Sequence, residues 1–292
     1  MTSTPVFYHP AQEVAFDFIS VAKIPEFIHQ LEGDVRSGFE PYTAADFEEA
    51  HHREYVRGVL KNVAPNGFGT IDPELTNSLL YSNAGHWAAA KHVLQQGGVR
   101  GGVRGGVACS ATQGFHHAHF EDGYGFCTFN GLMITAMKAL RNGATNVLII
   151  DGDGHHGDGT EDVLDHLMIR GRVTNITRPD IGRPVHSHWN AEMWQSFAKG
   201  LIRSSKAGII LYQAGADAWD QDPYGVGYLS KEGLAARDRG IFTAAREAGV
   251  PLVWNLAGGY AKPMQDTIDI HLQTLAISNE VYYAISQESL VR

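Results

Sequence analysis

The sequence predicts an α/β fold in which helices alternate with the strands of a mostly parallel sheet. Short apolar runs alternate along the chain with longer stretches of helical periodicity, a pattern typical of βαβ units. The apolar runs end at glycine or aspartate, where a strand gives way to a loop. No stretch rich in proline, serine or charge divides the chain, so we expect residues 1–292 to form one domain.

Four apolar runs are expected to form strands of this sheet, and they comprise residues 106–110, 146–150, 208–212 and 250–255. Apolar residues at helical spacing predict one helix over 129–140 and another over 84–94. A third helix is expected from a cap at Ser230 to about Ala248, with Gly249 as its stop.

A short repeat precedes the first of these strands. Gly-Gly-Val-Arg occurs twice and Gly-Gly-Val-Ala once over residues 97–108. A glycine-rich loop that binds a dinucleotide follows a strand and opens a helix. This segment instead follows a predicted helix and leads into a strand, so we expect a lengthened flexible loop.

Composition argues against several classes of protein. With 23 Lys and Arg residues against 32 Asp and Glu, the formal net charge is −9, and we expect no nucleic-acid partner. No apolar run approaches the roughly 20 residues of a membrane-spanning helix, so no membrane partner is expected. Residues 1–10 lack the pattern of a signal peptide, which predicts a cytoplasmic protein. Cys109 and Cys127 are expected to be buried free thiols.

The segment after the predicted strand over 146–150 has the composition of a metal site. It reads Asp-Gly-Asp-Gly-His-His-Gly-Asp-Gly over residues 151–159. In an extended backbone, Asp151, Asp153 and His155 would share one side and offer oxygen and nitrogen ligands. A polar loop is the alternative, but carboxylates this close repel each other unless a positive charge neutralises them.

A third ligand can come from another strand end. Asp217 follows the predicted strand over 208–212, and sites in α/β proteins form at the carboxyl ends of strands. Asp153, His155 and Asp217 would form a two-carboxylate, one-histidine site with an open position for water. Taken alone, Asp217 suits a turn or a helix cap equally well.

Two histidines beyond the predicted strand over 106–110 can handle protons. His116 and His117 are adjacent, and histidine has a pKa near neutrality without special help. Carboxylates behind the rings would fix the ring tautomers, and Asp151 and Asp158 are available for this role. A His-His pair on its own more often belongs to the surface or the core.

A tyrosine follows the predicted strand over 250–255. Gly258 and Gly259 expose Tyr260 at the strand end, where its hydroxyl could donate a hydrogen bond to a developing oxyanion. Alone, Gly-Gly-Tyr indicates only a turn.

Together these four elements resemble the histone deacetylase superfamily, which includes acetylpolyamine amidohydrolases. Their order and spacing agree over roughly residues 50–262. The matching motifs are Gly-Phe-His-His-Ala at 114–118, Gly-Phe-Cys at 125–127 with Asn130, the run over 151–159, Gly-Ala-Asp at 215–217 with Asp222-Pro223, and Gly-Gly-Tyr at 258–260. The resemblance implies a three-layer α/β/α fold of the arginase/deacetylase type around a mostly parallel sheet.

The resemblance also implies how the metal and the general base are arranged. One zinc ion per chain would be held by Asp153, His155 and Asp217. His117 would act as general base and acid, with its ring backed by Asp158.

Further roles follow from the same family pattern. His116, backed by Asp151, would act mainly as an electrostatic partner, and Tyr260 would polarise the acyl carbonyl. Gly125 and Phe126 would line the substrate channel. A structural potassium ion is implied near the backbone of Asp151.

Single residues depart from the family pattern at three positions. Gly152 and Gly154 stand where relatives usually carry bulkier side chains, which loosens the metal-binding segment. Tyr224 is assigned to the channel, near the place where polyamine-selective relatives carry a glutamate. Tyr224 therefore argues against a polyamine substrate.

The interval over 158–217 is also short for the family. Its loop over 177–189 does not match the usual wall of the channel. We expect His186 and His188 to lie on a solvated loop rather than to face the site.

These observations predict a metal-dependent hydrolase that removes an acyl group, with acetyl expected, from acyl-lysine or a small acylated amine. One alternative is a dinuclear metal ureohydrolase of the related arginase fold, which lacks the His-His and Gly-Gly-Tyr motifs. Another is a catalytically inactive relative that binds acyl ligands, which Gly152 and Gly154 keep open. Acyl length and oligomeric state are not predicted, and a homo-oligomer stays open.

Overall fold

Apolar runs along the chain form the strands of one seven-stranded sheet in which all neighbouring strands are parallel. The computed structural model describes residues 3–16, 18–96, 105–178 and 180–283. The strand order is β2-β1-β3-β7-β6-β4-β5. The strands are β1 (Val6–Phe7), β2 (Val35–Arg36), β3 (Val107–Ser110), β4 (Val147–Asp151), β5 (Val173–Ile176), β6 (Ile209–Gln213) and β7 (Leu252–Asn255).

The four predicted strands correspond to β3, β4, β6 and β7, which are the four central strands of the sheet. Each of them is buried along its whole length. The remaining strands, β1, β2 and β5, are two to four residues long and lie toward the two edges. They carry too few apolar residues to stand out in the sequence.

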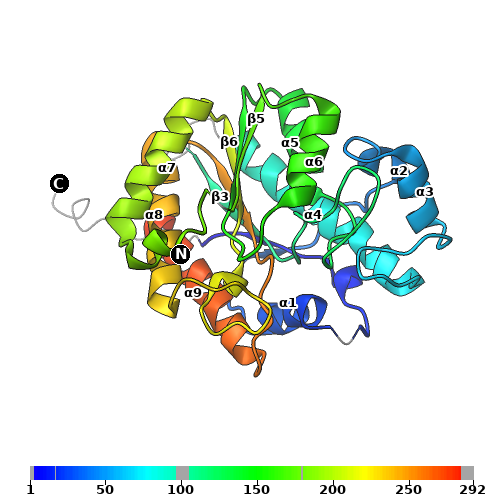
Figure 1. The fold of residues 1–292 in the computed structure, drawn as a ribbon, viewed down its shortest axis with the longest axis horizontal. Helices are drawn as coiled ribbons and strands as arrows, with labels where there is room; N and C mark the ends of the chain where they lie inside the picture. Colours follow the sequence, from blue (N-terminus) through cyan, green and yellow to red (C-terminus); the bar gives the residue numbers. More distant parts are fainter. Residues whose placement is uncertain (1–2, 17, 97–104, 179, 284–292) are drawn as a thin grey trace.

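Helices cover both faces of the sheet (Figure 1). On one face lie α1, α7, α8 and α9, and on the other lie α4, α5 and α6, with α2 and α3 beyond them. The helices are α1 (Ile19–His29), α2 (Ala44–Phe47), α3 (Arg53–Leu60), α4 (Pro73–Gln96), α5 (Gly131–Arg141), α6 (Asp158–Leu167), α7 (Ala191–Ser205), α8 (Lys231–Ala248) and α9 (Gln265–Tyr283). This is the three-layer arrangement that the resemblance implied.

The predicted helices begin and end close to the expected residues. The side chain of Ser230 caps α8, and Gly249 ends it in the left-handed conformation with φ = 67°. Asn130 caps α5 through its side-chain oxygen, so this helix begins slightly later than predicted. The helix expected over 84–94 is longer, because α4 begins at Pro73.

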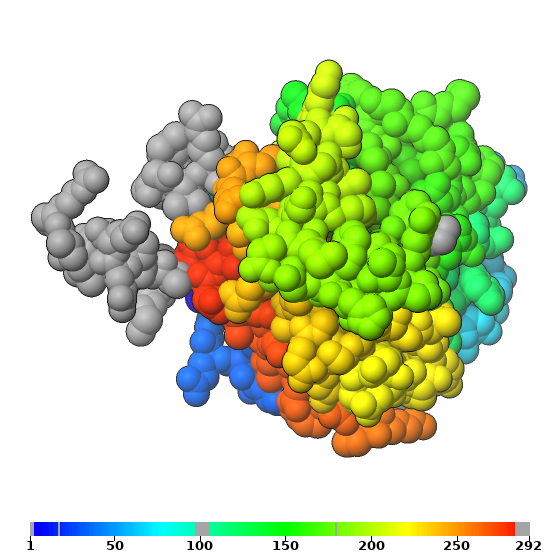
Figure 2. Space-filling view, turned by 60° about the vertical axis from the view of Figure 1, so that its left-hand side comes forward, coloured from blue at the N-terminus to red at the C-terminus, as the bar shows by residue number. Residues whose placement is uncertain are grey.

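Successive residues of a strand face opposite sides of the sheet and so enter two separate cores. In β4, Val147 and Ile149 pack under α4 to α6, whereas Leu148 and Ile150 pack under α7 to α9. Figure 2 shows this second face from outside, covered by the green, yellow and orange residues of the second half of the chain.

Several sequence expectations can be placed on this fold. Both cysteines are free and buried, as predicted. Residues 97–104 of the Gly-Gly-Val-Arg repeat lie outside the described residues; the repeat connects α4 to β3, as expected. No helix within the described residues is long and apolar enough to cross a membrane.

Candidate active site

The carboxyl ends of β3, β7, β6 and β4 lie side by side, and the loop after each strand carries part of one site. These loops contribute, in chain order, His116 and His117, then Asp153 and His155, then Asp217, and finally Tyr260. Polar residues also join the strand ends, because Gln213 of β6 donates a hydrogen bond to Asp151 of β4 at 3.2 Å. The structure thus brings together all four segments that the sequence singled out.

Asp153, His155 and Asp217 form a compact group of potential metal ligands. One ligand atom from each residue lies within 4.8 Å of the other two. His155 Nδ1 lies 3.2 Å from Asp153 Oδ1 and 3.0 Å from Asp217 Oδ2. Within the described part of the chain, this is the one such group of three. Two carboxylates and one imidazole suit zinc and leave a coordination position open.

The charges of this group favour a cation. Burial and the neighbouring Asp153 raise the pKa of Asp217 to about 6. Hydrogen bonds to Asp153 and Asp217 raise the pKa of His155 to about 11. The same two carboxylates that attract a proton to His155 would hold a divalent cation in its place, with His155 giving up that proton on binding. The residues present therefore fit a metal ion.

The backbone of this segment differs from the predicted one. β4 ends at Asp151, and residues 153–155 form bends instead of the extended chain that we expected. The Asp153 N–H donates to Asp151 Oδ1 at 3.2 Å, and the His155 N–H donates to Asp153 Oδ1 at 3.1 Å. These tight turns aim Asp153 and His155 at Asp217, whereas the Asp151 side chain turns toward His116.

His116 and Asp151 form what we call the inner pair. His116 Nδ1 donates to Asp151 Oδ2 at 2.7 Å, and both side chains are almost fully buried, with 3% and 0% exposed. Burial alone would lower the pKa of His116, but the charges of Asp151 and Asp153 outweigh it and raise this pKa to about 9. The inner histidine is therefore protonated at neutral pH.

His117 and Asp158 form the outer pair, with 15% and 42% of their side chains exposed. His117 Nδ1 donates to Asp158 Oδ1 at 2.6 Å. Since a carboxylate only accepts, this bond leaves the lone pair of the neutral ring on Nε2. Burial lowers the pKa of His117 below its usual value, and the charge of His116 lowers it further against the effect of Asp158. The outer histidine is thus neutral at pH 7.

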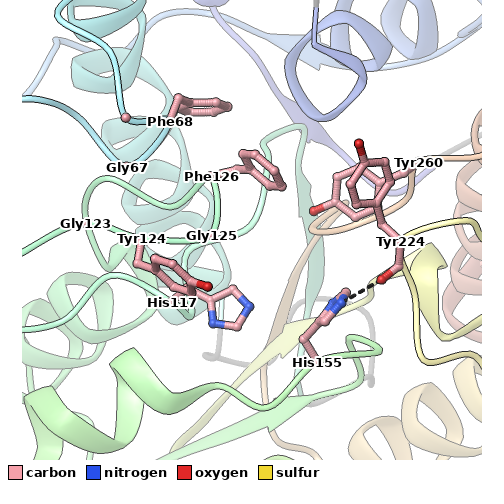
Figure 3. A pocket seen from close by; sticks show the side chains of 11 residues that line it. Gly67, Phe68, His117, Gly123, Tyr124, Gly125, Phe126, His155, Tyr224 and Tyr260 are labelled. Carbon is pink, nitrogen blue, oxygen red and sulfur yellow. Dashed lines mark hydrogen bonds between the residues drawn. The ribbon is translucent and has the colours of Figure 1, made fainter.

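A cavity of about 520 Å³ opens onto these groups. Figure 3 shows Phe68 and Phe126 on one side, Tyr260 and Tyr224 on the other, and His117 and His155 at one end. The channel residues named from the sequence, Gly125, Phe126 and Tyr224, all line it. Sequence reasoning missed Phe68, which comes from a loop without a recognised motif, and Tyr124, which directly precedes the Gly-Phe-Cys motif at 125–127.

The loop carrying Gly125 and Phe126 adopts an unusual backbone. Both residues have positive φ values, 53° and 65°, and Phe126 is one of few non-glycine residues to do so. A Cβ atom at position 125 would lie 2.6 Å from His117 Cδ2, so only glycine lets this loop pass the histidine ring. The Phe126 N–H donates to the Gly67 carbonyl at 3.0 Å and holds the ring in the wall of the cavity.

None of the described residues of the loop over 177–189 lines the cavity. His186 is buried with its ring 4.3 Å from the Trp189 ring and 5.4 Å from that of Trp194. The expectation of a solvated loop is therefore wrong for His186, because these aromatic rings provide an apolar site for it. His188 is exposed, as expected.

Lys23 is a buried residue near the site that the sequence did not reveal. Its ammonium donates to the Ala257 carbonyl at 2.6 Å, behind Tyr260. Burial lowers the pKa of Lys23 to about 8, although Asp217 and other carboxylates oppose this effect. The sequence offers only a weak signal, a single lysine within the otherwise apolar stretch of α1.

Comparison with known families decides where this chain belongs. The family model described as "Histone deacetylase domain" matches residues 19–177, which is more than half of the chain. The chain belongs to the histone deacetylase family. The range matched by the family model includes the inner and outer His-Asp pairs and the metal-ligand candidates Asp153 and His155. It ends before Asp217 and Tyr260.

Named relatives of this family member include enzymes of two kinds. It is 30% identical over 182 residues to "Histone deacetylase 2" of Arabidopsis thaliana, covering 56% of this chain and 46% of that protein. It is 27% identical over 176 residues to "Acetylpolyamine amidohydrolase" of Mycoplana ramosa, covering 51% and 50%. The chain spans about half the length of these two relatives. An uncharacterized Synechocystis protein is 27% identical over 288 residues, covering 87% and 89%.

Solved structures confirm the fold of the deacetylase family over nearly the whole chain. The HDA15 HD domain matches with a TM-score of 0.73 at 17% identity, covering 98% of this chain and 92% of that one. An acetylpolyamine aminohydrolase from Burkholderia pseudomallei matches with a TM-score of 0.74 at 16% identity, covering 96% and 99%. Identities this low establish the shared fold alone.

Proposed function

We propose that this chain is a zinc-dependent amide hydrolase that removes an acyl group from acyl-lysine or a small acylated amine. Acetyl is the acyl group that we expect. One observation carries this proposal. His117, His155 and Tyr260 line one cavity, His155 contacts Asp153 and Asp217, and the two His-Asp pairs lie beside this group.

One zinc ion would be held by Asp153, His155 and Asp217. When bound at such a site, the ion acts as a Lewis acid that polarises a carbonyl oxygen and makes a water molecule more acidic. The potassium ion expected near the backbone of Asp151 stays a prediction.

His117 is the residue suited to move the proton. Its Nε2 lone pair is free because Nδ1 is engaged with Asp158. Nε2 would accept the proton of the attacking water and then pass it to the nitrogen of the leaving amine. The carboxylates around His116 favour its protonated form in the metal-free site, so it is less suited than His117 to accept a proton and would contribute positive charge instead.

Tyr260 is suited to stabilise the oxyanion. Burial and the carboxylates of Asp217 and Asp153 raise the pKa of Tyr260 well above 10, so the hydroxyl keeps its proton and can donate. The Tyr260 N–H donates to Asp222 Oδ2 at 2.6 Å, which fixes the backbone at this position. The hydroxyl would donate to the carbonyl oxygen as negative charge develops there.

The lining of the cavity favours substrates without a second positive charge. Within the described residues, no Asp, Glu, Lys or Arg side chain lines it. Aromatic rings can contact an alkyl stem or a ring, but no carboxylate is placed to bind a distant ammonium group. We therefore expect acyl-lysine and monoamine amides to be better substrates than acetylpolyamines.

A hydrolysis panel tests the proposal. Zinc-loaded protein is assayed with acetyl-lysine peptides, longer acyl-lysines, acetylated monoamines and acetylpolyamines. We expect turnover of the first three classes to exceed that of acetylpolyamines, and Tyr260→Phe to lower kcat by about 10²–10³-fold because one oxyanion donor is lost. Binding of an acyl ligand without hydrolysis of any substrate would instead identify an inactive relative.

A further inference from the structure

The metal-ligand candidate Asp153 stands between two glycines, and the backbone beside Gly154 leaves no room for a side chain there. A Cβ atom at Gly154 would lie 2.6 Å from the Asp217 carbonyl oxygen, and one at Gly152 would lie 3.1 Å from the Tyr212 ring. Glycines lose more conformational entropy on ordering than other residues. A segment that must hold Asp153 and His155 in place therefore needs support from outside itself.

Two arginines from distant elements supply hydrogen bonds to the carbonyl groups of these same two glycines. Arg237 Nη1 donates to Gly152 O at 2.7 Å, and Arg178 Nη1 donates to Gly154 O at 2.6 Å. Asp153 is thus held from both sides, and neither arginine belongs to a motif that identified the site.

Arg237 lies on α8, fully buried beneath the site. Its Nη1 also donates to Gly215 O at 3.1 Å, so one guanidinium joins the loop of Asp153 to the loop of Asp217. Asp238 pairs with Arg237 at 2.9 Å and itself accepts from Thr274 at 2.6 Å. Because this carboxylate neutralises the guanidinium, Arg237 can orient the two loops without adding net charge beside a cation.

Arg178 lies two residues after the end of β5 and reaches the segment from there. Its Nη1 also donates to Val226 O at 3.3 Å, which ties Gly154 to the loop that carries Tyr224. Gly182 leaves room for the arginine because it has no Cβ atom. A Cβ atom at this position would lie 2.5 Å from Arg178 Cδ. The side chain therefore passes over a glycine to reach its two carbonyls.

We propose that Arg178 and Arg237 are positioning residues that set the spacing of Asp153, His155 and Asp217 and so preorganise the metal site. This inference rests on the proposed function, since it assumes that these three residues bind a metal. Each arginine bridges two loops through one nitrogen, Nη1, and the shorter lysine side chain would not bring its ammonium to the same place. Groups that orient metal ligands typically change metal affinity about 10–100-fold when removed.

The test measures metal binding directly, with no substrate. The dissociation constant for Zn²⁺ is determined by competition with a chromophoric chelator, and the absorption spectrum of the Co²⁺-loaded protein reports ligand geometry. Arg178→Met should weaken Zn²⁺ binding about 10–100-fold and alter the Co²⁺ spectrum, with Arg178→Lys intermediate. Gly182→Ala, which displaces the arginine without removing it, should shift both readouts in the same direction.

Arg172→Met is the matched control. Arg172 also donates to backbone carbonyls, that of Thr145 at 2.9 Å among them, but at the opposite end of β4 and β5. Its loss should leave Zn²⁺ affinity and the Co²⁺ spectrum unchanged. Circular dichroism and thermal unfolding of every variant confirm that the proteins compared are folded. Because Arg237 is fully buried and pairs with Asp238, its role is tested with Arg237→Lys, which keeps the positive charge.

The possible outcomes separate the two proposals. A wild-type protein that binds no Zn²⁺ overturns the proposed function itself. Tight Zn²⁺ binding by the wild type, with equal affinity and an equal Co²⁺ spectrum in folded Arg178→Met, overturns the positioning role alone.

Discussion

The inner pair and the outer pair contain the same two residue types, and their histidines are adjacent in the chain, yet their histidine pKa values move in opposite directions. The pKa of buried His116 rises to about 9, whereas the pKa of the more exposed His117 falls below its usual value. Burial by itself would lower both. The difference teaches that burial lowers the pKa of both histidines and that only His116 has enough carboxylates around it to reverse the effect.

The surroundings of each pair explain this result. His116 lies among Asp151, Asp153 and Asp217, whose charges act on an almost fully buried ring. The carboxylate of the outer pair, Asp158, is 42% exposed, so solvent screens it, and the charge of His116 opposes protonation of His117. One pair thus suits a fixed charge and the other a proton acceptor.

The largest effect should come from removing the outer histidine. His117→Ala is expected to lower kcat by about 10²–10⁴-fold, because it removes the neutral ring that accepts a proton. His116→Ala should lower kcat less, since the inner histidine already carries a proton at pH 7. Both variants are assayed at equal zinc content on an acetyl-lysine peptide. An equal or larger loss in His116→Ala would reverse the assignment of base and fixed charge.

The next largest effect is a loss of stability. We expect a substitution in the inner pair to cost more stability than one in the outer pair. Asp151→Asn breaks a fully buried pair and is expected to lower the free energy of unfolding by about 3–5 kcal/mol. Asp158→Asn removes a partly exposed carboxylate and should cost only about 0.2–1 kcal/mol. Urea denaturation of the two variants at pH 7 measures both changes, and similar values would show that the pairs do not differ in burial energetics.

The smallest effect should come from the residue that supports the inner pair. The Thr177 hydroxyl donates to Asp151 Oδ2 at 3.1 Å and accepts from the Gly157 N–H at 2.8 Å. Thr177→Val leaves the buried Gly157 N–H without an acceptor, whereas Asp151 Oδ2 keeps its bond from His116, and the change should cost about 1–3 kcal/mol in the same denaturation experiment.

Thr145→Val is the control for this substitution. Its hydroxyl makes an exposed bond to the Lys206 carbonyl at 3.3 Å, and its loss should change stability by less than about 0.5 kcal/mol. A Thr177→Val variant as stable as this control would mean that Asp151 does not depend on the hydroxyl.

Much of the fold and the site centre could be predicted because the necessary signals are local. The four central strands are continuous apolar runs, and Asp153, His155, His116 and His117 follow two of them directly. Strand ends in a parallel sheet share one edge, so local order along the chain was enough to predict proximity.

The supporting residues could not be predicted because their partners are backbone carbonyls far away in the chain. Arg178 and Arg237 bind carbonyl groups of glycines, and a carbonyl has the same chemistry at every residue. Lys23 likewise binds the Ala257 carbonyl. The pKa difference between His116 and His117 was hidden for a related reason, since it depends on how many carboxylates surround each ring in space.

The closeness of Gly182 to Arg178 constrains the evolutionary history of both positions. A lineage that gains a side chain at 182 while the arginine is in place must push the arginine away from its carbonyls. Loss of the arginine first removes that conflict, so the order of the two mutations determines whether the intermediate protein keeps its ligands in place. The two positions should therefore change together among descendants of this sequence, even though neither one touches a substrate.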